Sequence, residues 1–117
     1  MRARIAALSL ASALVIVSPA SAHVGVKSYS PKRGSTVSRS LERVKVTFKS
    51  VITDGKLTVR GPNGDKVSRG DGAVVNHDRV LRVRLKGGKR PGRYTVSMSV
   101  LNTDGHVTHK SWSFNLN

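Results

Sequence analysis

Apolar and polar residues alternate in several separate segments of this 117-residue chain, and this pattern restricts the fold more than any other feature. Side chains of a β-strand point alternately to two faces, so alternation predicts strands with one buried and one solvent-facing side. Residues 44–49 illustrate it, since their apolar members alternate with Lys45, Thr47 and Lys49. Turn signals, such as Gly-Pro-Asn-Gly at residues 61–64, separate these segments. We therefore expect strands over residues 44–49, 56–60, 81–86, 94–100 and 112–116.

Two shorter segments, residues 24–29 and 73–75, bring the expected number of strands to about seven. Ser38–Leu41 is a candidate for a short helical turn, and no other segment after residue 22 shows a convincing helical period. An all-β domain with connections rich in Gly, Pro, Asn and Asp folds as a β-sandwich or a small barrel. We predict an immunoglobulin-like domain of this kind.

Residues 1–22 are typical of a cleaved secretory signal peptide. Arg2 and Arg4 give a positive start, residues 5–17 are mostly apolar, and Ala20-Ser21-Ala22 is a small-residue cleavage site. Cleavage after Ala22 would leave residues 23–117 as one small extracytoplasmic domain, either periplasmic or secreted. The sequence contains no cysteine, so neither disulfides nor thiolate metal ligands contribute to this domain.

The chain is strongly basic, with a formal net charge of +15. Such a charge attracts anionic surfaces, and an anionic envelope surface is a possible partner. A charged face that only keeps the protein in solution is the alternative. Specific nucleic-acid binding is not expected, because the domain is exported and no aromatic residues are interleaved with the charges as stacking platforms.

His23 acquires special chemistry if the chain is cut after Ala22. An N-terminal histidine presents a free α-amine and an imidazole Nδ1, which together close a six-membered chelate ring on a metal ion. An internal histidine cannot do this, because its backbone nitrogen is an amide without a basic lone pair. The alternative is that histidine follows the cleavage site by chance, so the hypothesis requires further ligands elsewhere in the chain.

The segment Asn102-Thr103-Asp104-Gly105-His106 offers those ligands. In an extended segment Asp104 and His106 would project to the same side, with Gly105 leaving room for close approach. Together with His23 they would supply three nitrogens and one oxygen, a set that suits tetragonal Cu(II). Asp-Gly is also a common turn, which is the alternative interpretation. We expect His77 to be a turn residue and His109 a surface residue facing away from His106.

Several short motifs, taken in order, resemble those of the CopC family of exported copper-binding proteins. The resemblance spans residues 23–117 and rests on His23 with the turn at residues 30–34, and on residues 44–48, 92–96, 102–106 and 112–114. It implies a Greek-key β-sandwich or barrel and a Cu(II) site formed by His23, Asp104 and His106. The methionine-rich loop that some members use for Cu(I) is missing from this sequence.

The resemblance implies an exported, monomeric Cu(II)-binding protein without enzymatic turnover, which sequesters copper or delivers it to a membrane transporter. Two other functions remain open. A basic immunoglobulin-like module could bind envelope polymers, with its histidines incidental. A copper-brace oxidase would also use an N-terminal histidine, but the Asp104 carboxylate would then occupy a position that oxygen chemistry needs open.

Overall fold

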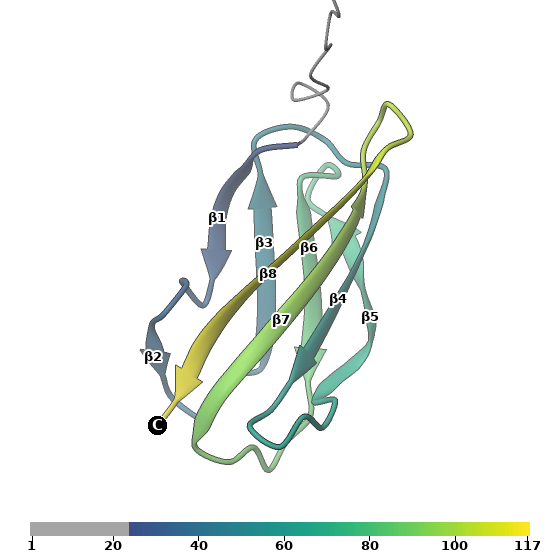
Figure 1. The fold of residues 1–117 in the computed structure, drawn as a ribbon. Helices are drawn as coiled ribbons and strands as arrows, with labels where there is room; N and C mark the ends of the chain where they lie inside the picture. The colour runs from purple at the N-terminus through teal and green to yellow at the C-terminus, as the bar shows by residue number, and fades with distance from the viewer. Residues whose placement is uncertain (1–23) are drawn as a thin grey trace, which may run out of the picture.

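Two four-stranded sheets face each other in the computed structural model, which describes residues 24–117 (Figure 1). The strands are β1 (Val26–Ser30), β2 (Thr36–Val37), β3 (Arg43–Phe48), β4 (Asp54–Arg60), β5 (Ser68–Val75), β6 (Val80–Leu85), β7 (Gly92–Leu101) and β8 (Val107–Leu116). This arrangement confirms the predicted all-β sandwich. Within the described residues, no helix has the length and apolar character needed to cross a membrane.

The first sheet has the strand order β1-β3-β6-β5 and the second β2-β8-β7-β4. Neighbouring strands are antiparallel, except that β2 runs parallel to the end of β8. The strand missing from the sequence prediction is β2, because two residues are too few to show a period. Ser38–Leu41 is not a helix, and its one backbone hydrogen bond, from Leu41 N–H to the Ser38 carbonyl, closes a turn.

Strand β5 begins at Ser68, five residues before the predicted segment 73–75. Its register shifts between Arg69 and Ala73, and this irregular stretch contains Gly70 and Gly72, both with positive φ. Glycines and a β-bulge interrupt the alternation of side chains on which the prediction depends. The early half of β5 was therefore not visible in the sequence.

The core lies between the sheets and consists of the apolar residues that alternate in the sequence. All the predicted strands contribute, including Met98, which is 3% exposed as expected of a core residue. The two largest polar aromatic side chains also satisfy their donors. The Trp112 indole donates to the Pro31 carbonyl at 3.0 Å, and the Tyr94 hydroxyl donates to the Arg90 carbonyl at 2.7 Å.

Four connections meet at one end of the sandwich, the upper end in Figure 1. Backbone hydrogen bonds tie them together: Lys49 N–H donates to Gly25, Ile52 N–H to Asp78, and Thr53 N–H to Leu101. The start of β1, the β3–β4 loop, the β5–β6 turn and the β7–β8 hairpin therefore share this end. It carries the predicted metal-ligating residues that the structure describes.

Candidate metal centre

The hairpin between β7 and β8 presents the predicted ligands Asp104 and His106. These strands pair without interruption from Gly92 opposite Leu116 to Leu101 opposite Val107. At the tip, the Asn102 N–H donates to the His106 carbonyl at 2.8 Å, and the Gly105 N–H donates to the Asn102 carbonyl at 3.0 Å. These two bonds close a short turn at the end of the long antiparallel β7–β8 pairing, which holds the turn in place.

The segment is a turn, as the alternative interpretation held, and the extended conformation is wrong. The turn nevertheless brings the two side chains together. Asp104 Oδ1 accepts a hydrogen bond from the His106 N–H at 2.9 Å, and Asp104 Oδ2 lies 3.1 Å from His106 Nδ1. Gly105 is required for its φ of +90° rather than for space, since a Cβ there would meet no atom within 4 Å.

The His106 hydrogen bonds also favour the charged form of Asp104. The bond from the His106 backbone N–H, followed by that from its imidazole, lowers the pKa of the Asp104 carboxyl. An ionised carboxylate only accepts hydrogen bonds, so the facing Nδ1 carries hydrogen in the neutral ring. The other nitrogen, Nε2, is then the one available to a metal ion. The side chains of His106 and Asp104 are 69% and 41% exposed, so an ion can reach them from solvent.

Asn102 supports the hairpin from inside. Its side chain is buried, and Nδ2 donates to Thr108 Oγ1 at 2.9 Å across the base of the turn. Its Oδ1 is buried and accepts no hydrogen bond from the described residues. Sequence reasoning did not predict this structural role, although a signal was present. Asn102 continues the inward-facing positions of β7 that run from Tyr94 to Val100.

The two other described histidines, His77 and His109, do not join Asp104 and His106 in a group of three ligands. His77 stands in the β5–β6 turn with a φ of 58°, which confirms the predicted turn. That turn shares the upper end of the sandwich with the hairpin. His109 is exposed on β8 opposite Ser99. His23 lies outside the described residues, but Val24 and Gly25 begin the described chain at the end where the hairpin lies.

Within residues 24–117, no group of three or more His, Asp or Glu side chains gathers as a metal site would require. The described residues supply one imidazole nitrogen and one carboxylate oxygen. Both are exposed, and the carboxylate is ionised. Such a pair fits a transition-metal ion as half of a site, and a further ligand group must complete it.

Comparisons with known proteins agree on one family. A family model described as the CopC domain matches residues 26–117. The structure of CopC from Methylosinus trichosporium OB3b is similar, with a TM-score of 0.68 and 22% identity over 81% of this chain and 94% of that one. PcoC, a methionine-rich copper resistance protein from Escherichia coli, has a TM-score of 0.64 and 20% identity over 82% of this chain and 100% of that one. No curated protein matches the sequence.

Proposed function

This chain belongs to the CopC family, and we propose that it binds Cu(II) outside the cytoplasm through His23, Asp104 and His106. The observation that carries the proposal is the Asp104–His106 pair. The pKa of its carboxyl is lowered, its imidazole faces the carboxylate through Nδ1 and so leaves Nε2 for a metal ion, and it lies at the end of the sandwich where residue 24 begins. His23 would complete the set with its α-amine and imidazole nitrogen.

The donor set favours Cu(II) over other ions. Three nitrogens and one carboxylate oxygen suit a tetragonal site, and Cu(II) stands above Zn(II) in the Irving–Williams order. Cu(I) prefers thiolates and thioethers. The chain has no cysteine and only two methionines, and one of these, Met98, is buried in the core. We therefore expect tight binding of Cu(II) and weak binding of Cu(I).

The proposed role is binding without turnover, either to sequester copper or to hand it to a membrane transporter. A ligand set of three nitrogens and a carboxylate leaves no equatorial position open for a reacting substrate. We expect a monomer, and the proposed site needs no second copy because its ligands all come from one chain.

The position of the cleavage site can be tested first. We expect exported protein to have the mass of residues 23–117, because Ala20 and Ala22 occupy the small-residue positions before the cut. Intact-mass measurement checks this. A start at any other residue would remove the α-amine ligand and refute the proposed site.

The ligands can be tested by one series of Cu(II) affinity measurements at fixed pH. His106→Ala and His23→Ala each remove a nitrogen donor and should weaken binding by about 100-fold or more. Asp104→Asn should weaken it less, because the amide keeps the shape and loses the charge. His109→Ala is the matched control, since it removes an exposed histidine from the same strand pair and should change little.

Two further measurements strengthen the series. One extra residue before His23 should weaken binding as severely as His23→Ala, because it converts the amine into an amide. Affinity should also fall as the pH drops, because protons compete with the metal ion for the nitrogen ligands. If His106→Ala binds Cu(II) like the parent while His109→Ala does not, the assignment of the ligands is wrong.

A further inference from the structure

The outer face of the sheet β1-β3-β6-β5 carries rows of cations on neighbouring strands. Arg43 on β3 stands opposite Arg84 on β6, and Arg84 stands opposite Arg69 on β5. In the next row, Lys45 stands opposite Arg82. All five side chains are exposed, and we call them the cationic face. The alternation predicted that Lys45, Arg82 and Arg84 face solvent, but only the structure shows that the five cations are adjacent.

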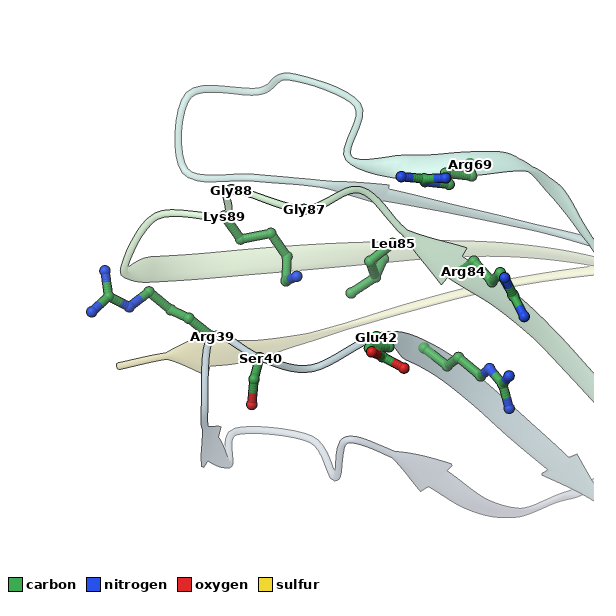
Figure 2. Close-up of a pocket in the computed structure, with 10 residues that line it drawn as sticks. Arg39, Ser40, Glu42, Arg69, Arg84, Leu85, Gly87, Gly88 and Lys89 are labelled. Carbon is green, nitrogen blue, oxygen red and sulfur yellow. The ribbon is translucent and has the colours of Figure 1, made fainter.

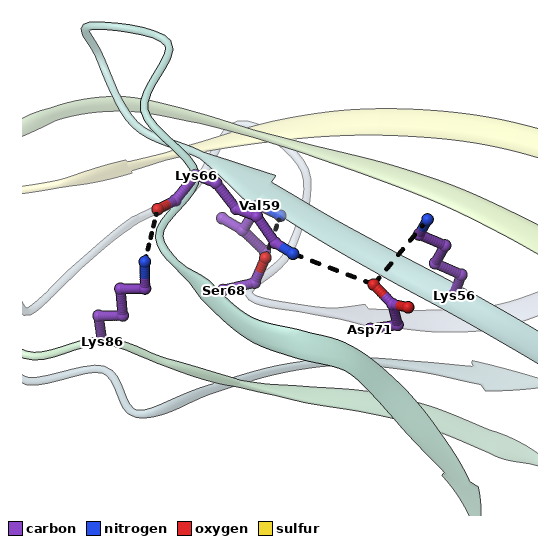
Figure 3. Close-up of polar contacts among 6 residues, drawn as sticks. All are labelled: Lys56, Val59, Lys66, Ser68, Asp71 and Lys86. Carbon is purple, nitrogen blue, oxygen red and sulfur yellow. Dashed lines mark hydrogen bonds and ion pairs between the residues drawn. The ribbon is translucent and has the colours of Figure 1, made fainter.

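These cations have no acidic partners in the described part of the chain. The ion pairs found there join Lys56 and Lys66 to Asp71, and His106 to Asp104. Figure 3 shows that Asp71, although it lies on β5, is engaged by Lys56 and Lys66 rather than by the cationic face. Like charges directly opposite each other on a sheet are destabilising. The face is therefore unfavourable in the free protein and is stabilised when external anions cover it.

A hollow of about 520 Å³ lies beside the cationic face, where β3 begins and β6 ends. Arg69, Arg84, Arg39 and Lys89 line it together with one acidic residue, Glu42 (Figure 2). Arg43 lines it as well, so five cations surround one carboxylate. The hollow widens the positive surface beyond the strands. It is large enough to admit a phosphate-bearing group, and it lies at the opposite end of the sandwich from the β7–β8 hairpin.

The outer face of the second sheet is different. Its rows consist mainly of hydroxyl side chains, with Thr58 opposite Ser97 and Ser97 opposite Ser111. Its strands carry four cations, Lys56, Arg60, Arg93 and Lys110, and none of them stands opposite another cation. Cations that directly face one another across strands therefore occur on the first sheet and not on the described strands of the second.

We propose that the cationic face is a docking surface for the anionic phospholipids of a membrane. Its cations are spread over a broad sheet, about 5 Å apart across strands and about 7 Å apart along a strand. A surface of this kind matches a layer of phosphate headgroups better than a single bound anion. The hollow beside it offers further contacts to a headgroup. Each Lys or Arg brought to an anionic membrane surface strengthens binding by about fivefold.

Two observations distinguish a membrane from other partners. All five aromatic residues pack inside the sandwich or half-buried at its edge, so the face has no platform on which bases could stack. The exposed large hydrophobics of the described chain, Val51 and Val107, lie at the hairpin end rather than on this face. Binding should therefore be electrostatic and peripheral, without insertion into the hydrocarbon layer.

The docking surface is separate from the proposed copper site. Asp104 and His106 lie at the upper end of the sandwich, whereas the cationic face is the outer side of one sheet. A molecule resting on this sheet leaves the hairpin uncovered. Membrane binding should therefore be the same with and without Cu(II), and the two proposals fail or succeed independently.

The test is binding of the chain from His23, which contains every strand of the sandwich, to phospholipid vesicles. We expect binding to vesicles containing phosphatidylglycerol, no binding to pure phosphatidylcholine, and loss of binding at high salt. The variant Arg43→Thr/Arg69→Thr/Arg84→Thr should bind about 100-fold more weakly. The control Lys32→Thr/Arg93→Thr/Lys110→Thr removes the same number of charges from exposed sites elsewhere. Its affinity for the vesicles should fall by less than about fivefold.

Three outcomes would overturn the proposal. Equal losses in the two triple variants would show that net charge, not this face, drives binding. Equal binding to phosphatidylcholine vesicles would show that anionic headgroups are not recognised. Tighter binding to soluble polyphosphate than to the vesicles, at equal phosphate concentration, would identify a linear polyanion as the partner. Unfolding curves of both variants confirm that they are folded.

Discussion

Asp104 is oriented by one neighbour, His106, whose hydrogen bonds also favour the charged form of the carboxyl. Each carboxylate oxygen faces a nitrogen of that residue, one in the backbone and one in the ring. The contact depends on Gly105, whose positive φ lets the chain turn back on itself within two residues. In a strand, two residues separated by one other would point to the same side. Here a turn brings the side chains of Asp104 and His106 together instead. The result is a preformed pair of oxygen and nitrogen donors.

We predict that Asp104 titrates below the ordinary range of an aspartate. Its folded-state pKa is lowered, so its stabilising effect is present above the unfolded-state pKa and is lost as the pH falls through the folded-state value. His106→Ala removes the imidazole but keeps the backbone N–H, so the pKa should rise only part of the way. A ¹³C carboxyl NMR titration measures this. His109→Ala is the control, and an unchanged Asp104 pKa in His106→Ala would contradict the role of the imidazole.

Strand β5 shows how one element departs from regular alternation and remains part of the sheet. The buried Ser68 Oγ accepts a hydrogen bond from the Val59 N–H at 3.0 Å, which ties the start of β5 to β4 of the opposite sheet (Figure 3). After this tie, the strand bulges between Arg69 and Ala73 before it pairs with β6 again. Gly72 lies in the bulge, close against the backbone of β6.

We predict that Gly72→Ala destabilises the protein by about 2 to 4 kcal/mol. A Cβ at this position would lie 2.6 Å from the Arg82 carbonyl oxygen, a backbone atom that cannot move aside, and φ is +91°. Gly70→Ala is the matched control, because φ is +69° but no atom lies within 4 Å. It should cost only about 1 kcal/mol. Urea unfolding compares the two, and equal losses would show that backbone strain alone accounts for both.

At the scale of the whole molecule, the balance of charge opposes folding. Only six acidic residues accompany the 21 Lys and Arg residues of the sequence. None of the six forms an ion pair with the cationic face; Asp71 pairs with Lys56 and Lys66, and Asp104 lies against His106. Compaction brings the cations together, and self-repulsion destabilises the compact state. The hydrophobic core between the sheets offsets this cost without disulfides.

We predict that added salt stabilises the protein and that the triple variant of the cationic face reduces this effect. Salt screens repulsion among exposed charges, so the free energy of unfolding should rise with ionic strength. At low salt, Arg43→Thr/Arg69→Thr/Arg84→Thr should be more stable than the parent by about 1 kcal/mol, because it removes like charges from facing positions. Urea unfolding at several salt concentrations measures both. A variant less stable than the parent at low salt would contradict the argument.

The sequence by itself determined the all-β class, most strand positions and nearly all core residues, because alternation of side chains is a local property of a strand. It also determined that Asp104 and His106 are neighbours, since two residues span a short distance in either conformation. The copper ligand His23 stays a prediction. Only the tertiary structure decided the two-residue strand β2, the early half of β5 and the burial of Asn102. It alone decided that Arg43, Arg84 and Arg69 share a row, because strand order and register depend on contacts between residues far apart in the chain.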